Sequence, residues 1–513
     1  MQTGLETATK QPLKGNMLWF AALILAAANF IAVLDMTIAN VSVASIAGNL
    51  GATTSQGTWV ITSYAVAEAI TVPLTGWLAS RFGAVRVFVT AMGMFGICSA
   101  LCGFADSLGL LVAARVLQGL AGGPMMPLSQ TLLMRIFPKE KAAAANGLWA
   151  MTTLVAPVVG PVLGGWLCDN YSWPWIFYIN VPIALACGWI AWQMLKRYEQ
   201  NLDHSRIDKV GLGLLIIWVA ALQIMLDEGK DLDWFSSPII VGLAIVAVVG
   251  FVAFLIWELT ERYPVVDLRV FRHRGFSASV LTISLAFGAF FAANVLTPLW
   301  LQTNMGYTAT WSGKTTAWSG VAAVTVAPLA AFLSTKIDPR KLVFCGVLWL
   351  GMVTFGRSIL TSDVNYWWIA APIFLMGFGL PFFFVPLTGL ALASVDEPEM
   401  ASAAGLMNFL RTLSGAFATS LVNTAWEDKT NYNHAELSGL VDGAGVYGHA
   451  MTEAGMTPEM ARGLIDQLTT SQSVMLATNE IMIYASIALV IAAFAIWLAP
   501  KPTRVVDASQ AGH

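Results

Sequence analysis

Residues 17–39 read MLWFAALILAAANFIAVLDMTIA, an apolar stretch that holds one charged side chain, Asp35. A helix needs about 20 apolar residues to cross the hydrocarbon core of a bilayer, so this stretch predicts a membrane span. It is too long for the apolar region of a signal peptide, and no small-residue cleavage site follows it. A charge near mid-bilayer costs about 2.5–3.5 kcal/mol, so we expect Asp35 to pair with another group or to take part in function.

The whole chain shares this apolar character. Of its 513 residues, 57% are hydrophobic and 11% are charged, whereas a soluble domain carries about 25% charged residues. Fourteen membrane spans are predicted, with these approximate limits: 17–39, 58–79, 87–105, 108–134, 142–167, 175–195, 210–227, 239–258, 276–301, 310–335, 341–360, 366–394, 401–426 and 477–498. An even number of spans places both termini on the same side of the membrane.

Lysine and arginine predict the orientation. Twenty of them lie at the N-terminus, in the turns that follow even-numbered spans and in the C-terminal tail. The opposite side holds Lys230, Lys429 and Arg462. Because loops rich in Lys and Arg stay in the cytoplasm, we expect both termini to be cytoplasmic.

The second half of the sequence repeats the first. The segment PLTGWLASRFGAVR at 73–86 aligns with PLAAFLSTKIDPRK at 328–341, an offset of 255 residues. Other positions match at nearly the same offset: Gly119 with Gly377, Pro127-Leu128 with Pro386-Leu387, and Gly147-Leu148 with Gly405-Leu406. Several matches at nearly one offset indicate a duplication. It predicts two parallel six-helix halves, formed by spans 1–6 and 9–14, with an inserted hairpin at 210–258.

Five short motifs carry a resemblance to a known family. In chain order they are LDMTIANV (34–41), GWLASRFGAVR (76–86), LVAARVLQG (111–119), APVVGPVLGG (156–165) and WIFYINVP (175–182). With these motifs in this order and topology, the chain resembles the fourteen-span drug:proton antiporters of the major facilitator superfamily, EmrB/QacA type. The similarity covers essentially the whole chain. Ser80 stands where the family often has an acid.

The resemblance implies an all-α membrane protein with the major facilitator fold. Its fourteen transmembrane helices form two pseudo-symmetric six-helix bundles and an inserted two-helix hairpin. The expected domains are an N-terminal six-helix bundle (1–195), the hairpin with its cytoplasmic linkers (196–275) and a C-terminal six-helix bundle (276–513) with an external loop at 427–476. Within this loop, the proline at the first turn of 457–468 predicts a helix.

Asp35 and Arg115 are expected at similar depth in the outer half of the bilayer, on an outgoing and a returning helix. An acid beside a base can bind and release a proton as access alternates, and the resemblance lends this coupling role to both residues. The alternative is a static ion pair that locks two helices. Glu68 in the second span is another candidate for carrying protons or binding a cationic drug. Its alternative is a neutral, hydrogen-bonded acid.

Arg411 lies in the middle of the thirteenth span, where it can attract an anionic substrate or pair with an acid. We place it in the substrate pathway with Asn40 and Gln118 of the first and third motifs. The resemblance assigns gating and antiporter roles to residues of the second and fourth motifs: Gly76, Arg81, Gly83, Arg86, Pro157, Gly160, Pro161, Gly164 and Gly165. Tight helix packing and the positive-inside rule are simpler explanations for these positions.

Other chemistries are not supported by the placement of the residues. The five cysteines are scattered without metal-ligand spacing, and the five histidines fall in predicted loops or tails. We therefore expect no metal, no cofactor, no enzymatic activity and no nucleic-acid binding.

The resulting hypothesis is a proton-coupled multidrug efflux antiporter that exports amphipathic toxic compounds across the bacterial inner membrane. In close relatives of the EmrB type, the pump passes its cargo to a periplasmic adaptor (EmrA-like) and an outer-membrane channel. The resemblance implies the same partners here, with the 427–476 loop as the expected adaptor contact. A non-transporting receptor or scaffold with the same fold, and a proton-coupled importer, are the alternatives.

Overall fold

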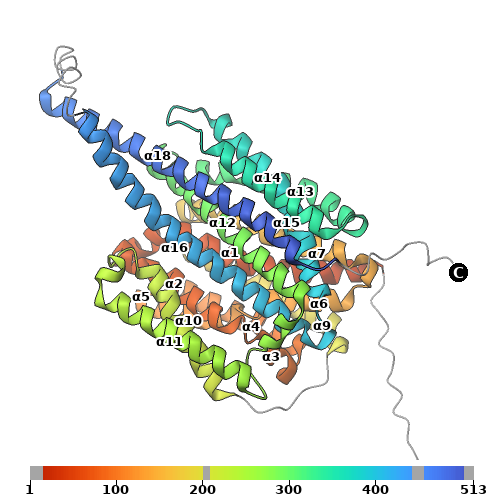
Figure 1. The fold of residues 1–513 in the computed structure, drawn as a ribbon. Coiled ribbons are helices and arrows are strands. Elements are labelled where there is room, and N and C mark those ends of the chain that lie inside the picture. Colours follow the sequence, from red (N-terminus) through yellow and green to blue (C-terminus); the bar gives the residue numbers. More distant parts are fainter. Residues whose placement is uncertain (1–14, 200–207, 442–455, 502–513) are drawn as a thin grey trace, which may run out of the picture.

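The computed structural model describes residues 15–199, 208–441 and 456–501, and the regular elements in these ranges are helices (Figure 1). The N-terminal half contains α1 (Asn16–Asn49), α2 (Thr54–Thr71), α3 (Thr75–Phe82), α4 (Ala84–Gly103), α5 (Leu108–Gly122), α6 (Met125–Ile136), α7 (Lys139–Asn170), α8 (Trp175–Tyr178) and α9 (Asn180–Leu195). The inserted hairpin contains α10 (Lys209–Glu228) and α11 (Pro238–Thr260). The C-terminal half contains α12 (Arg274–Thr303), α13 (Ala309–Lys336), α14 (Pro339–Arg357), α15 (Tyr366–Ala393), α16 (Met400–Val441) and α18 (Pro458–Ala495). Short 3-10 turns also occur: η1 (Lys196–Tyr198), η2 (Trp234–Ser236), η3 (Leu268–Arg272), η4 (Glu397–Glu399) and η5 (Ile496–Leu498).

The predicted all-α membrane fold is confirmed. In the described ranges, ten helical stretches are long and apolar enough to cross a membrane, and α7 makes an eleventh if its two parts count as one span. These parts, Ala145–Pro157 and Val159–Cys168, meet at an angle of 41°. The predicted count of fourteen is compatible with this result, because α2, α14 and α16 are helical at the predicted positions but fall outside the apolar set. In α16, for example, Asn408 and Arg411 interrupt the apolar sequence.

Helix pairs in the C-terminal half repeat those of the N-terminal half. Helix α1 packs on α7 as α12 packs on α16, α2 packs on α5 as α13 packs on α15, and α4 packs on α9 as α14 packs on α18. The repeated glycines occupy equivalent contacts. A Cβ added to Gly119 would lie 2.8 Å from Ala67 Cβ, and one added to Gly377 would lie 2.6 Å from Ala322 Cβ. Only a residue without a Cβ lets these helix backbones approach so closely, which supports the duplication inferred from the sequence.

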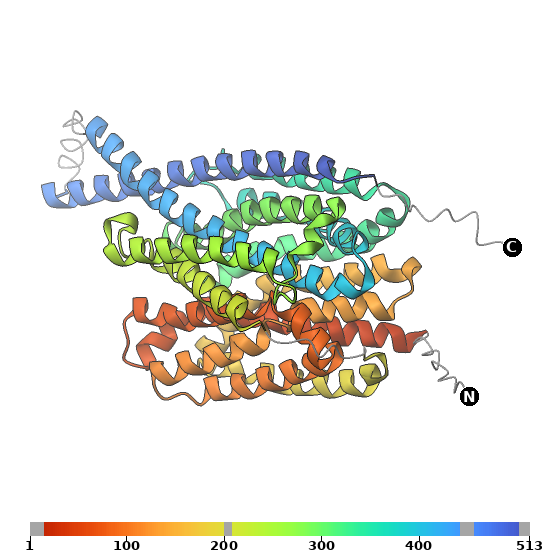
Figure 2. The same ribbon diagram turned by 60° about the horizontal axis from the view of Figure 1, so that its bottom comes forward.

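The two halves meet tightly at one end of the bundle. We call this the terminal end, because α1 begins and α18 ends there, on the right of Figure 2. Four buried polar side chains link the halves at this end. Asn146 donates to Thr388 Oγ1 at 2.6 Å, Gln130 donates to Asn146 Oδ1 at 3.2 Å, and Asn408 donates to Gln130 Oε1 at 3.4 Å. The bundle is therefore closed at its terminal end.

The inserted hairpin lies along one side of the bundle (Figure 1). Helix α10 packs against α2 of one half and α16 of the other, and α11 packs on α10. The Trp218 ring contacts the Phe409 ring with 5.9 Å between centroids, and Ser420 donates to the Leu226 carbonyl at 2.7 Å. The hairpin thus spans the boundary between the halves on this side.

Beyond the opposite end, α16 and α18 run on together and protrude from the bundle (Figures 1 and 2). The predicted 427–476 loop is thus largely helical: residues 427–441 continue α16 and 458–476 begin α18, while 442–455 lie outside the described residues. No proline interrupts residues 400–441, so α16 extends past its apolar part. The helix predicted at 457–468 is confirmed, with Thr457 as N-cap and Pro458 in its first turn. Lys429 and Glu480 join the two helices through an ion pair at 2.8 Å.

Candidate functional site

Asp35 and Arg115 form an ion pair inside the N-terminal half. Arg115 Nη1 on α5 lies 2.5 Å from Asp35 Oδ2 on α1, and both side chains are fully buried. The guanidinium also donates through Nε to the Val60 carbonyl of α2 at 2.9 Å. The pairing predicted from their depth is therefore present. Further hydrogen bonds to the polar atoms of a buried ion pair help to offset the cost of removing its charges from water, so its neighbours matter.

The Asp35 carboxylate accepts further hydrogen bonds from two buried amides. Gln118 Nε2 donates to Oδ1 at 3.0 Å, and Asn180 Nδ2 donates to the same oxygen at 2.8 Å. Arg115 Nη1 also donates to Gln118 Oε1 at 2.8 Å. Asn180 lies within the fifth motif at the start of α9, and the sequence alone did not predict a role for it. Its place in that motif was the signal that could have identified it.

A row of unsatisfied polar atoms leads away from the pair. The Arg115 Cζ lies 4.1 Å from the centroid of the Tyr64 ring on α2. Glu68 lies one helical turn after Tyr64, so both face the same side of α2. Among the described residues, Arg115 Nη2, Tyr64 Oη and Glu68 Oε2 are buried without a hydrogen-bond partner. Buried polar atoms are seldom left unpaired, so this row is a place where water, a proton or a moving side chain can be accommodated.

Arg411 lies at the boundary between the halves. It is 3% exposed, and its Nη2 donates to Met126 Sδ of α6 at 2.7 Å. Its Cζ lies 5.3 Å from the centroid of Phe287 on α12. Its Nε and Nη1 are buried without a partner among the described residues. Among the described residues, the acid Glu68 is near enough to interact with it electrostatically. Arg411 thus offers two free donors beside flexible and aromatic apolar groups.

The remaining predicted pathway residue lies apart from the ion pair. Asn40 is exposed and lies five residues after Asp35 on α1, about 7.5 Å further along the helix axis. The structure brings Gln118 to the ion pair and leaves Asn40 outside it.

The fourth motif holds α7 against α1 just beyond Asp35. Added Cβ atoms at Gly160 and Gly164 would lie 3.1 Å from Ile38 N and 2.8 Å from Ile38 Cγ1. Gly165 has open space around it. Pro157 and Pro161 lie inside the helix, which bends between Pro157 and Val159. Close packing at two of the three glycines, and a bend at the first proline, fix how α7 crosses α1.

The second motif forms the α3–α4 turn at the terminal end. Gly83 has φ +93°, a backbone conformation that side chains with a Cβ rarely adopt. The Glu199 carboxylate accepts from Arg86 N at 2.9 Å and caps α4. A Cβ on Gly76 would lie 2.8 Å from Ser402 Cα of α16, so this motif packs against the other half. Ser80 donates to the carbonyl of Trp77 at 2.9 Å, and Arg81 lies in the last turn of α3.

One group of possible metal ligands occurs in the described part of the chain. His273, Asp396 and Glu399 have ligand atoms within 4.8 Å of one another at the terminal end. Arg272 donates to Glu399 Oε1 at 2.7 Å, and His273 Nε2 lies 2.9 Å from Glu399 Oε2. Because Arg272 already balances the Glu399 charge, the group fits an ion-pair network better than a metal site.

Comparisons with known proteins place the chain in a family. The sequence pattern of the Major Facilitator Superfamily matches residues 25–419. "Multidrug export protein EmrB" of Escherichia coli K12 is 43% identical over 499 residues, covering 96% of this chain and 97% of the relative. "Fatty acid resistance protein FarB" of Neisseria gonorrhoeae is 42% identical over 495 residues, covering 96% and 98%. The crystal structure of the human organic anion transporter MFSD10 (TETRAN) aligns with a TM-score of 0.59 at 12% identity, covering 93% of this chain and 100% of that one.

The chain belongs to the Major Facilitator Superfamily. Its predicted resemblance to EmrB-type proteins is confirmed over nearly its full length. It is a membrane transporter and not an enzyme.

Proposed function

We propose that the chain is a proton-coupled antiporter that exports amphipathic toxic compounds across the cytoplasmic membrane. The observation that carries this proposal is the fully buried Asp35–Arg115 ion pair. A charge pair at membrane depth is costly and marks a proton or ion pathway by default. Relatives at 42–43% identity named for multidrug export and fatty acid resistance support export as the direction.

Protonation of Asp35 is the proposed coupling step. A proton on the carboxylate removes the negative partner of Arg115, and a buried charge left without its partner costs about 3–5 kcal/mol. Glu68 offers a replacement, because its Oε2 is unpartnered among the described residues and Arg115 is near enough to interact with it. Transfer of Arg115 from Asp35 towards Glu68 would shift α5 against α1. In this proposal, that shift links proton binding to the movement of the halves.

Arg411 is the proposed contact for the polar end of a substrate. Its two free donors lie beside Met126 and Phe287. The flexible methionine side chain adapts to varied apolar shapes, and the phenylalanine ring adds apolar surface. A buried guanidinium attracts an acidic or polar head. Glu68 lies close enough to interact electrostatically with this contact. A substrate at Arg411 and a proton at Asp35 would therefore influence one another through Glu68.

The proposed orientation places the terminal end in the cytoplasm. The concentration of Lys and Arg in loops at that end supports it. The described arrangement is closed at the terminal end by the Asn146 and Gln130 hydrogen bonds. It therefore corresponds to a state of the transport cycle in which the cytoplasmic side is sealed.

The protruding parts of α16 and α18 are the proposed contact for a periplasmic adaptor, which would pass cargo to an outer-membrane channel. They extend beyond the bundle at the end opposite the termini (Figures 1 and 2). Exposed Tyr432, Leu440 and Met460 lie on them. A stable protein interface buries about 1,200–2,000 Å², and a pair of long helices provides more surface than a short turn.

A proton-release assay tests the proposed function. Purified protein in detergent is mixed with anionic, neutral and cationic amphiphiles, and the protons released on binding are measured. We expect release by the wild type and none by Asp35→Asn with the same ligand. Substrate binding without proton release in the wild type would favour a scaffold, receptor or uniporter. Equal proton release by the wild type and Asp35→Asn would show that the released proton comes from a group other than Asp35.

A further inference from the structure

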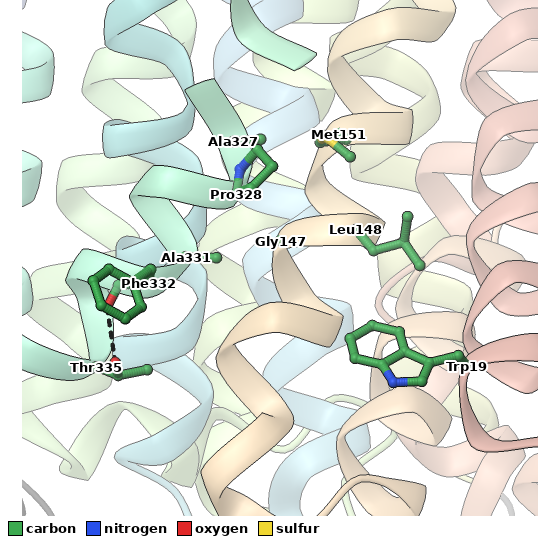
Figure 3. A pocket seen from close by; sticks show the side chains of 9 residues that line it. All are labelled: Trp19, Gly147, Leu148, Met151, Ala327, Pro328, Ala331, Phe332 and Thr335. Atoms are coloured by element: carbon green, nitrogen blue, oxygen red, sulfur yellow. Dashed lines mark hydrogen bonds between the residues drawn. The ribbon is translucent and has the colours of Figure 1, made fainter. Parts of the chain in front are cut away.

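A crevice between the two halves opens sideways near the terminal end. Trp19 of α1 and Gly147, Leu148 and Met151 of α7 form one wall, and α13 forms the other through Ala327, Pro328, Ala331, Phe332 and Thr335 (Figure 3). Its volume is about 430 Å³, in the range of ligand pockets. Trp19 and Phe332 are 41% and 55% exposed. Both side chains lie on helices long and apolar enough to cross a membrane, so we expect the crevice to face lipid.

The floor of the crevice is made by small residues. A Cβ on Gly147 would lie 3.3 Å from Ala331 Cβ, so α7 and α13 touch there. The larger side chains of Trp19, Leu148 and Phe332 stand on either side (Figure 3). The Thr335 hydroxyl donates to the carbonyl of Phe332 in its own helix at 2.7 Å. The lining is therefore apolar, as an acyl chain requires.

A cation stands at the rim of the crevice. Lys336 Nζ lies 4.4 Å from the centroid of the Phe332 ring. Lys336 is exposed, and no carboxylate of the described residues forms an ion pair with it. Lys336 is the last residue of α13, so its ammonium lies where a lipid headgroup would be. Basic groups between transmembrane helices at this level attract anionic headgroups.

The pseudo-symmetric counterpart of this crevice is covered. Phe332 and Lys336 align with Trp77 and Arg81 at the offset of 255 residues. On that side Gly76 packs against Ser402, and α10 of the inserted hairpin lies along both α2 and α16. No helix of the hairpin covers the α7–α13 side within the described contacts. The inserted hairpin therefore leaves one of two equivalent places open to lipid.

We propose that this crevice binds one anionic phospholipid from the leaflet at the terminal end. Its acyl chain would lie on Phe332, Leu148 and Met151, and its phosphate would bind Lys336. The lipid would touch both halves at once. It therefore stabilises the arrangement closed at the terminal end, because a ligand shifts an equilibrium towards the state that it binds better. This proposal does not depend on which cargo the chain transports.

Native mass spectrometry of the full, purified chain tests the proposal. Binding is compared for phosphatidylglycerol, for phosphatidylcholine with the same acyl chains, for laurate and for inorganic phosphate. We expect the wild type to retain one phosphatidylglycerol in preference to phosphatidylcholine. Lys336→Ala should weaken phosphatidylglycerol binding about fivefold, because one basic group near the surface contributes about 1 kcal/mol. Lys341→Ala, which removes an exposed lysine outside the crevice at the same end, is the matched control and should leave binding unchanged.

A second variant separates the crevice from general surface attraction. Leu148→Trp fills the apolar space without changing charge, and we expect it to abolish retention of phosphatidylglycerol while Lys336 is still present. Retention by Leu148→Trp, or equal weakening by Lys336→Ala and Lys341→Ala, would overturn the proposal. Preference for laurate over phosphatidylglycerol would also overturn it, because the crevice would then bind single-chain acids. If the protein bound inorganic phosphate but no phospholipid, the site would be a surface cation and not a lipid-binding crevice, and the proposal would be wrong.

Discussion

Asp35 and Arg115, 80 residues apart in the sequence, form a fully buried ion pair with 2.5 Å between Oδ2 and Nη1. The pair joins α1 to α5, while Asn180 brings in the start of α9 and Val60 the backbone of α2. A change in the charge of either partner therefore acts on four helices of the N-terminal half.

Replacing Arg115 should damage transport in a graded way. Arg115→Ala leaves the Asp35 carboxylate buried without its cation, at a cost of about 3–5 kcal/mol. Arg115→Lys keeps the charge but cannot reproduce the planar fork that reaches both Val60 O and Asp35. We expect transport to be lost in the first variant and reduced in the second, with the pH optimum altered in both. Rates measured against pH in proteoliposomes test this, and an unchanged pH profile in both variants would argue against the pairing as the coupling element.

The sequence predicted this pair because depth can be counted along two spans of known direction. It did not predict Asn180, Tyr64 or Ser99 around the pair. Ser99 Oγ accepts from Asn180 Nδ2 at 3.3 Å and donates to the Phe177 carbonyl at 2.8 Å. These residues come from three other helices, and only the crossing angles of α2, α4 and α9 bring them together. Such angles depend on tertiary packing, which a single sequence does not encode in its hydropathy.

The protruding helices show a second limit of sequence reading. Residues 427–441 are polar enough to suggest a loop, but no helix breaker separates them from the apolar part of α16. Hydropathy marks where a helix leaves the membrane, while propensity and capping mark where it ends. The Thr457–Pro458 start of α18 was readable from the sequence because its cap is local.

Removing the ionisable group of Glu68 should change the coupling ratio. Glu68→Gln keeps the shape of the side chain and removes its charge, so Arg115 has no alternative carboxylate when Asp35 is protonated. We expect fewer protons exchanged per substrate, or slower exchange, in proteoliposomes loaded with a pH-sensitive dye. Tyr64→Phe removes the neighbouring unpartnered hydroxyl but no carboxylate, so comparing the two variants shows whether the change in ratio requires the loss of the acid. An unchanged ratio in Glu68→Gln would make this acid a structural group.

Weakening the polar contacts between the halves should open the terminal end. Asn146→Ala removes the bond to Thr388 Oγ1 and leaves the buried Gln130 Nε2 without its acceptor, at a cost of about 1–3 kcal/mol. We expect a thiol introduced by Ser402→Cys, in a background without the native cysteines, to react several-fold faster with a water-soluble reagent. Asn294→Ala is the control, because Asn294 donates to the Phe290 carbonyl of its own helix. Equal reactivity in the Asn146 and Asn294 variants would show that the network does not hold this end closed.

Shortening the protruding helices should separate transport from resistance. A variant that lacks 431–470 keeps the Lys429–Glu480 ion pair at the base of the protrusion. We expect it to transport normally in proteoliposomes and to confer less drug resistance in cells, because the adaptor contact is lost. Equal damage to both would assign the protrusion to the transport cycle. If neither transport nor drug resistance changed, the protrusion would not be the contact for an adaptor.

Proton-driven transport by Asp35→Asn tests the central proposal most directly. Asparagine keeps the shape of the side chain and the hydrogen bonds from Gln118 and Asn180, but it cannot be ionised. A pH difference of one unit is worth about 1.36 kcal/mol per proton. Without an ionisable group at position 35, the variant could not use this free energy to drive transport. Wild type and variant are reconstituted in parallel, and uptake under an imposed pH gradient is compared with substrate exchange at equal pH. We predict that the variant folds, inserts and retains exchange but loses accumulation driven by the gradient. Wild-type accumulation in Asp35→Asn would contradict the proposal that Asp35 couples protons to export.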